Sequence, residues 1–144
     1  MYIFVSYSKE GLNYASIVKN KLAGKQHITF LSHDESYGGS EAWTQISEAL
    51  YNARVVIFVV TESSQTSDGQ TAEFNATMNN AKPYIPFIKD GIVLKQFYIM
   101  TARNHIKFND SNISDKTDEL TSSIERMNIS EGDAMAVKLS NGDN

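Results

Sequence analysis

The chain has 144 residues, of which 41% are hydrophobic and 21% charged, so it is long enough to form one compact domain with a substantial core. Thirteen basic residues against 17 acidic ones give a net charge of −4, which provides no field to attract nucleic-acid phosphates or anionic lipids. Cysteine is absent, which excludes disulfides, thiol catalysis and cysteine-ligated zinc and fits a reducing cytosol. We therefore expect a cytoplasmic domain that has neither nucleic acid nor a membrane as a partner.

The first half of the chain alternates between short apolar runs and apolar stripes at helical spacing. Residues 2–7 carry no basic n-region, and polar residues follow too soon for a signal peptide, so we interpret this segment as a strand. The stripe over 12–22 predicts a helix, and 28–31 predict a second strand. A polar loop over 32–40 then leads to a second helical stripe over 43–53.

Residues 55–60 are six consecutive apolar residues, and they predict a strand that is buried on both faces of a parallel sheet. Ser67 followed three residues later by Gln70 has the form of a capping box, which predicts that a third helix starts there. We expect Lys82-Pro83 to end that helix.

The rest of the chain is less regular. Residues 84–88 predict a fourth strand, and Pro86, which has no backbone N–H, predicts that this strand is short or near a sheet edge. The segments that follow are a short helix and loop over 91–104, a short strand over 105–108, a helix marked by 120–127, and a loose tail over 129–144. We therefore divide the chain into a domain over 1–128 and a polar C-terminal tail over 129–144.

The alternation of strands and helices predicts an α/β fold. The expected form is a flavodoxin-like open parallel sheet of about five strands with helices on both faces, joined by right-handed crossovers. In such a sheet the strand-to-helix loops gather at the carboxyl edge, and ligands bind in the crevice there. Glu73 lies in the second turn of the predicted third helix, close to that edge. Since glutamate side chains are mostly exposed, these residues alone favour a solvated helix position over a catalytic one.

Several chemistries lack their signatures in the loops at this edge. A phosphorelay receiver needs an aspartate after the third strand and acidic metal ligands after the first, where this chain has Thr61 and Ser6-Tyr7-Ser8. The first loop contains one glycine, Gly11, instead of Gly-x-Gly-x-x-Gly, and there is no Walker sequence. His33-Asp34-Glu35 are adjacent on one loop, whereas closed metal sites usually need three or four convergent ligands, so we expect no metal site.

Motifs along residues 2–127 match, in order and spacing, those of one known family. The matching residues are Ile3-Phe4-Val5-Ser6-Tyr7-Ser8; Asp34, Gly38-Gly39, Trp43, Ile46 and Ala49-Leu50; Val55 to Thr61 with Ser63-Ser64; Glu73, Ala76, Asn80, Lys82-Pro83 and Ile85-Pro86; and Ile106-Lys107-Phe108 with Leu120 to Met127. Together they resemble the Toll/interleukin-1 receptor (TIR) domains. The resemblance implies the TIR fold and, as in many prokaryotic and plant members, cleavage of the bond between nicotinamide and ribose in NAD.

The resemblance also implies roles for individual residues, with NAD as the substrate and no cofactor. Glu73 is the expected catalytic residue, which would hydrogen-bond the ribose hydroxyls and stabilise a cationic, oxocarbenium-like ribosyl centre. The expected substrate-binding residues are Ser6, Tyr7, Ser8, Asp34, Tyr37, Gly38 and Trp43. Enzymatic members commonly carry an aromatic residue four positions before the glutamate, where this chain has Gly69, and Tyr37 or Trp43 is our candidate for a replacement stacking face. Trp43 fits core packing equally well, because it lies on the stripe of its own helix.

Several outcomes stay open at the level of sequence. Attack by water would give ADP-ribose, and attack by a nucleophile of the same molecule would give a cyclic isomer that a separate effector protein could bind as a signal. The competing interpretation is an interaction module that self-associates or docks onto other TIR domains through the loop over 32–40, and a nucleoside-processing transferase is a third. By analogy with the family we expect a homo-oligomer that acts in prokaryotic anti-phage defence.

Overall fold

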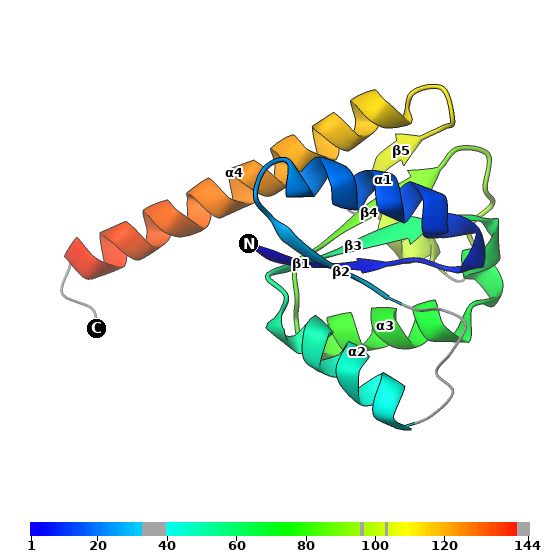
Figure 1. The fold of residues 1–144 in the computed structure, drawn as a ribbon, viewed down its shortest axis with the longest axis horizontal. Coiled ribbons are helices and arrows are strands. Elements are labelled where there is room, and N and C mark those ends of the chain that lie inside the picture. The colour runs from blue at the N-terminus through cyan, green and yellow to red at the C-terminus, as the bar shows by residue number, and fades with distance from the viewer. Residues whose placement is uncertain (33–39, 96, 103, 141–144) are drawn as a thin grey trace.

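The computed structural model describes residues 1–32, 40–95, 97–102 and 104–140, and the side chains among them except for 40–41 and 128–140. Strands and helices alternate along the chain (Figure 1). The elements are β1 (Tyr2–Ser6), α1 (Leu12–Ala23), β2 (Ile28–Leu31), α2 (Ser40–Asn52), β3 (Val55–Val60), α3 (Asp68–Asn79), β4 (Tyr84–Lys89), β5 (Ile106–Phe108) and α4 (Ile113–Ser140), with the short 3-10 helices η1 (Lys9–Gly11), η2 (Glu62–Thr66) and η3 (Tyr98–Ala102).

The five strands form one parallel sheet in the order β2-β1-β3-β4-β5. Helices α1 and α4 cover one face of the sheet, and α2 and α3 cover the other (Figure 1). The predicted flavodoxin-like α/β fold is therefore confirmed. Because the chain leaves β1 and β3 in opposite directions, the strand order reverses between these two strands, and their carboxyl ends flank the crevice where ligands bind in folds of this kind.

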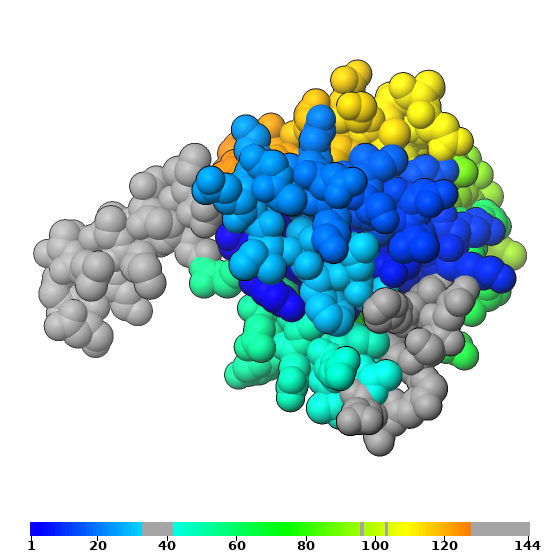
Figure 2. Space-filling view, in the orientation of Figure 1, coloured from blue at the N-terminus to red at the C-terminus, as the bar shows by residue number. Residues whose placement is uncertain are grey.

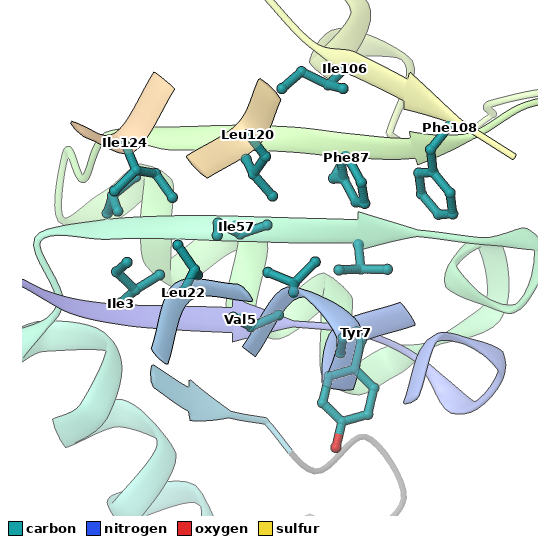
Figure 3. Close-up of a cluster of buried hydrophobic side chains, with 14 residues drawn as sticks. Ile3, Val5, Tyr7, Leu22, Ile57, Phe87, Ile106, Phe108, Leu120 and Ile124 are labelled. Atoms are coloured by element: carbon teal, nitrogen blue, oxygen red, sulfur yellow. The ribbon is translucent and has the colours of Figure 1, made fainter. Parts of the chain in front are cut away.

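Each face of the sheet carries its own apolar core because successive strand residues point to opposite sides. On β1, Ile3 and Val5 join the core under α1 and α4 (Figure 3), whereas Phe4 joins the core under α2 and α3. All six residues of β3 are buried, as predicted for a strand covered on both faces. The same alternation continues beyond Val5, and it decides which way the polar residues at the end of β1 point.

Helices α1 and α4 are neighbours on their face of the sheet. In Figure 2 the surface of α1, in blue, adjoins that of the first half of α4, in yellow to orange. Lys21 of α1 and Asp118 of α4 form an ion pair with an Nζ to Oδ1 distance of 2.9 Å. Below the surface, Leu120 and Ile124 of α4 reach the same core as Leu22 of α1 (Figure 3).

The position of β4 differs from the sequence expectation. This strand spans six residues and lies between β3 and β5, so it is neither short nor at the edge of the sheet. Pro86 is tolerated because it lies opposite Phe58 of β3, while β5 pairs only with residues 87–89 of β4. Pro86 therefore lies just before the stretch of β4 that pairs with strands on both sides. Within that stretch, a missing N–H would cost a ladder hydrogen bond.

Helix α4 is longer than the stripe over 120–127 predicts. It begins at Ile113 and continues to Ser140, so the segment expected to be a loose tail is helical through Ser140. Its second half extends beyond the sheet (Figure 1). Within the described part of the chain, no helix is both long and apolar enough to cross a membrane.

Candidate active site

Glu73 meets the end of β1 through Ser6. Side-chain alternation places Ser6 on the same face of the sheet as Phe4, and this is the face that α3 covers. The Ser6 Oγ donates a hydrogen bond to Glu73 Oε1 over 2.6 Å, and both residues are fully buried. The distance is typical of a hydroxyl that donates to a charged carboxylate.

Local sequence fixes the start of α3 and therefore the height of Glu73 above the sheet. The Ser67 Oγ accepts a hydrogen bond from the backbone N–H of Gln70 over 3.0 Å, as a helix N-cap does. The predicted capping box is only half formed, because the Gln70 side chain does not turn back to the N-cap. It reaches across to the sheet instead, where it becomes part of the site.

Gln70 ties the ends of two strands together. Its Nε2 donates to the backbone carbonyl of Ser6 over 3.2 Å and to that of Val59 over 3.0 Å. Gln70 and Glu73 are three residues apart on α3, so they lie on the same face of the helix, one turn apart. The buried Gln70 Oε1 has no hydrogen-bond partner among the described residues.

A cluster of hydroxyl groups lies beside this network, where β1 and β3 end. Ser8 Oγ lies 3.2 Å from Thr61 Oγ1 and 3.3 Å from Ser64 Oγ, and it also hydrogen-bonds Ser63 Oγ. The Ser64 Oγ in turn accepts the backbone N–H of Thr61 over 3.0 Å. Thr61 and Ser64 thereby cap η2 reciprocally, so the cluster holds the loop after β3 against the loop after β1.

The remaining expected site residues divide into two groups. Tyr7 lies in the core on the opposite face from Ser6, with its hydroxyl directed away from the apolar side chains (Figure 3), and its backbone N–H donates to Ser32 Oγ over 3.3 Å. Trp43 is partly buried against the core under α2 and α3, as expected for core packing. The other three expected substrate-binding residues, Asp34, Tyr37 and Gly38, lie outside the described residues.

The Glu73 carboxylate is closed off from solvent in this conformation. Glu73 does not line either of the following two cavities among the described residues. One, of about 990 Å³, lies at the carboxyl edge and includes Ser63 of the hydroxyl cluster, Glu10 and Glu62. The other, of about 900 Å³, lies at the amino edge between β4, β5 and α4. In this conformation Glu73 has no surface that a substrate could contact.

In the described part of the chain, no three His, Asp or Glu side chains lie close enough together to bind a metal ion. The loop residues 33–35, considered as a metal cluster from the sequence, lie outside the described residues.

The sequence did not point to Gln70 or Thr61 as parts of the site. The signal for Gln70 was its spacing, since a residue three positions before Glu73 shares its helix face. The signal for Thr61 was its place directly after β3, the strand next to β1. Both become visible only once the strand order is known.

Comparison with known proteins identified one matching domain family and similar solved structures. A family model described as TIR domain matches residues 3–123. Among solved structures, the chain is similar to the crystal structure of the RPS4 and RRS1 TIR domain heterodimer, with 11% identity and a TM-score of 0.66 over 87% of this chain and 96% of that chain. A weaker likeness is to E. coli constitutive lysine decarboxylase, with 14% identity and a TM-score of 0.43 over 86% of this chain and 18% of that one. The comparison with curated proteins gave no match.

Proposed function

This chain belongs to the Toll/interleukin-1 receptor (TIR) domain family, and we propose that it is an NAD-cleaving member in which Glu73 is the catalytic residue. The observation that carries the proposal is the buried 2.6 Å hydrogen bond between Ser6 Oγ and Glu73 Oε1. It fixes a carboxylate at the carboxyl ends of β1 and β3, where the strand order reverses and where ligands bind in open α/β sheets.

One carboxylate is sufficient for the chemistry. The bond between the ribose C1 and the nicotinamide nitrogen breaks, its electron pair goes to the nitrogen, and nicotinamide leaves as a neutral molecule without needing a general acid. Positive charge develops on the ribosyl centre, as in glycoside hydrolysis. A carboxylate that is already oriented stabilises that charge without reorganising at the moment of reaction, and Ser6 supplies the orientation. Water then adds to C1 and releases a proton, giving ADP-ribose.

The burial of Glu73 supports a role for movement in the cycle. A carboxylate that is 0% exposed acts on NAD only after the site opens, and a site that closes again over its substrate strengthens the electrostatic interactions inside it. We propose that assembly of several copies into a homo-oligomer favours the open, competent state. In this scheme NAD is the substrate, no cofactor takes part, and the hydroxyl groups of Ser8 and Thr61 hold the nucleotide.

We further propose a biological setting that follows from the family. The protein would act in the cytoplasm in prokaryotic anti-phage defence, either by depleting NAD or by releasing a cyclic ADP-ribose isomer. The cyclic product arises when a nucleophile of the same NAD molecule, in place of water, attacks C1. A separate effector protein would bind that product.

The direct test compares Glu73→Gln with the wild type at high protein concentration, with nicotinamide, ADP-ribose and cyclic products resolved by liquid chromatography and mass detection. The substitution is nearly isosteric and removes only the charge. We expect nicotinamide release to fall by about a hundredfold or more, the usual effect of losing a preorganised electrostatic group. The companion product identifies the reaction as hydrolysis or cyclisation.

The matched control is Glu119→Gln, which makes the same chemical change at an exposed position of α4. It should leave nicotinamide release unchanged. Thermal unfolding of both variants separates a loss of catalysis from a loss of folding. Equal release by wild type and Glu73→Gln, or no release by the wild type, would contradict the proposed activity.

The second candidate is an interaction module without catalysis. It is favoured by the similarity in fold to a TIR domain solved as a heterodimer. In this alternative the Ser6–Glu73 hydrogen bond is purely structural. The wild-type protein would then associate with itself or with another TIR domain, as measured by light scattering, while releasing no nicotinamide at any concentration.

A further inference from the structure

Among the described residues, Gln70 has a buried side-chain oxygen that lacks a hydrogen-bond partner. Its two amide hydrogens are used by the carbonyls of Ser6 and Val59, which fixes which end of the side chain is nitrogen and which is oxygen. The oxygen is buried and has no partner among the described residues. A buried acceptor without a partner is destabilising, and in native proteins such a group calls for an explanation such as a catalytic role.

Packing alone does not account for a glutamine here. A methionine of similar length would fill the same space and leave no side-chain oxygen in the interior. Gln70 instead holds an amide oxygen in a fixed direction, because its nitrogen is anchored to two strands at once. An anchored acceptor of this kind is suited to a donor group on a ligand.

The position of Gln70 indicates which ligand group that is. Gln70 and Glu73 are both fully buried on the same face of α3, and both contact Ser6. A movement that exposes Glu73 to a substrate therefore exposes Gln70 as well. Gln70 lies three residues, about 4.5 Å along the helix axis, before Glu73, so the substrate group that it would meet is one next to the bond that Glu73 acts on.

The chemistry of an amide oxygen beside a carboxylate narrows the choice. Both groups accept hydrogen bonds, so they repel phosphate oxygens and favour a cationic substrate group that carries N–H or O–H donors. In NAD the group next to the scissile bond is the cationic pyridinium ring, and its carboxamide carries an N–H donor. The acid analogue, nicotinic acid adenine dinucleotide, has a carboxylate at that position and no donor.

We propose that Gln70 Oε1 accepts a hydrogen bond from the carboxamide N–H of the nicotinamide ring, and that this contact makes the site selective for NAD over nicotinic acid adenine dinucleotide. The inference rests on the proposed NAD cleavage. It adds to that function a residue that determines which dinucleotide is cleaved. Nε2 positions the side chain, and Oε1 contacts the substrate.

The test measures kcat/KM for both dinucleotides with wild type, Gln70→Met and Gln70→Glu. The wild type should prefer NAD. Gln70→Met keeps the shape but removes both the acceptor and the anchoring donors, so we expect kcat/KM for NAD to fall by the loss of anchoring and by about a further 10- to 100-fold, the usual effect of a lost hydrogen bond to a buried group. The value for the acid analogue should fall by the loss of anchoring alone, so the ratio of the two values collapses.

Gln70→Glu keeps an acceptor and loses the amide donors, so it separates substrate contact from anchoring. It should lower both rates while retaining or increasing the preference for NAD, because a carboxylate repels the acid analogue. Thr121→Val, which removes a buried hydroxyl from α4, is the control for a general loss of polar contacts and should leave the ratio unchanged. Gln70→Asn, with a shorter amide, replaces Gln70→Met in the comparison if that variant does not fold.

The outcomes distinguish this inference from the function on which it rests. A wild type that cleaves both dinucleotides equally, or a Gln70→Met variant that lowers both rates by the same factor, would overturn the role of Gln70 and leave NAD cleavage standing. A wild type that cleaves neither dinucleotide would overturn the proposed function and this inference with it.

Discussion

A polar network at the carboxyl edge of the sheet is buried, whereas the charged residues of the cavity at the amino edge are exposed. At the carboxyl edge, Ser6, Glu73 and Gln70 are fully buried and hydrogen-bonded across β1, β3 and α3. At the amino edge, a cavity of about 900 Å³ lies between the starts of β4 and β5 and the middle of α4, and its charged residues Arg126 and Glu119 are exposed.

This difference indicates which side chains are held in a single geometry. A buried polar group without its partner costs free energy, so each partner at the carboxyl edge constrains the others. Exposed charges at the amino edge are solvated and screened, so little depends on where their side chains lie. The amino-edge cavity is therefore a poorer guide to function here than the closed network at the carboxyl edge, and substitutions at the two edges should differ accordingly.

After Glu73→Gln, the largest effect is expected for Ser6→Ala, which removes the donor to Glu73. Without this hydrogen bond the carboxylate is buried with one partner fewer and is no longer held in a single orientation. We expect nicotinamide release to fall by about 10- to 100-fold, the scale of a hydrogen bond to a charged group. Progress curves with NAD measure this, and an unchanged rate would mean that Ser6 does not position Glu73.

A smaller effect, on stability, is expected for Ser64→Ala in the hydroxyl cluster. The Ser64 Oγ accepts the backbone N–H of Thr61, and both residues are buried. Its loss leaves that N–H without its side-chain acceptor, so we expect the free energy of unfolding to fall by about 1–2 kcal/mol. Urea unfolding followed by circular dichroism is the measurement, and Ser122→Ala, at an exposed position of α4, is the control.

Glu125→Gln tests a polar contact at the amino edge that has a buried partner. Glu125 Oε1 lies 2.6 Å from Nε2 of the buried His27, which precedes β2. An amide keeps the shape and can still accept a hydrogen bond, so we expect a loss of about 0.5–1.5 kcal/mol in unfolding free energy and no change in NAD cleavage. A change in cleavage without a change in stability would contradict the separation of the two edges.

The smallest effect is expected for Arg126→Ala, in the amino-edge cavity. The Arg126 Nη2 donates to Ser123 Oγ over 3.1 Å on the surface of α4. Exposed contacts of this kind contribute little, so the free energy of unfolding should change by no more than about 0.5 kcal/mol. Unfolding and nicotinamide release are both measured, and a large loss of release would make this cavity a functional site.

Most of the fold could be predicted from apolar patterning. The strands over 28–31 and 55–60 have the predicted bounds, because their apolar runs are bordered by polar residues on both sides. Within the stripe over 12–22, Leu12 is 49% exposed, whereas Ala15, Val18 and Leu22 are buried.

The candidate site could be predicted only in part. Glu73 and Ser6 each came from a local motif, but the hydrogen bond between them depends on the strand order and on which face of β1 Ser6 occupies. The sequence predicts a capping role for Gln70, because it indicates only the backbone groups that are close to Gln70 along the chain. The competing partners, the carbonyls of Ser6 and Val59, belong to strands that precede α3 in the chain and are not adjacent to it in sequence.

The long separation between the partners in the network also affects how the protein folds. Ser6 and Glu73 are 67 positions apart in the chain, and Ser6 and Gln70 are 64 apart. Contacts of such separation form only after the intervening loop has closed, which delays them relative to the helices. The network of Ser6, Gln70 and Glu73 therefore cannot exist on a partly folded chain. After dilution from denaturant, we expect NAD cleavage to return later than the helical signal in circular dichroism, because cleavage requires α3 to dock onto β1.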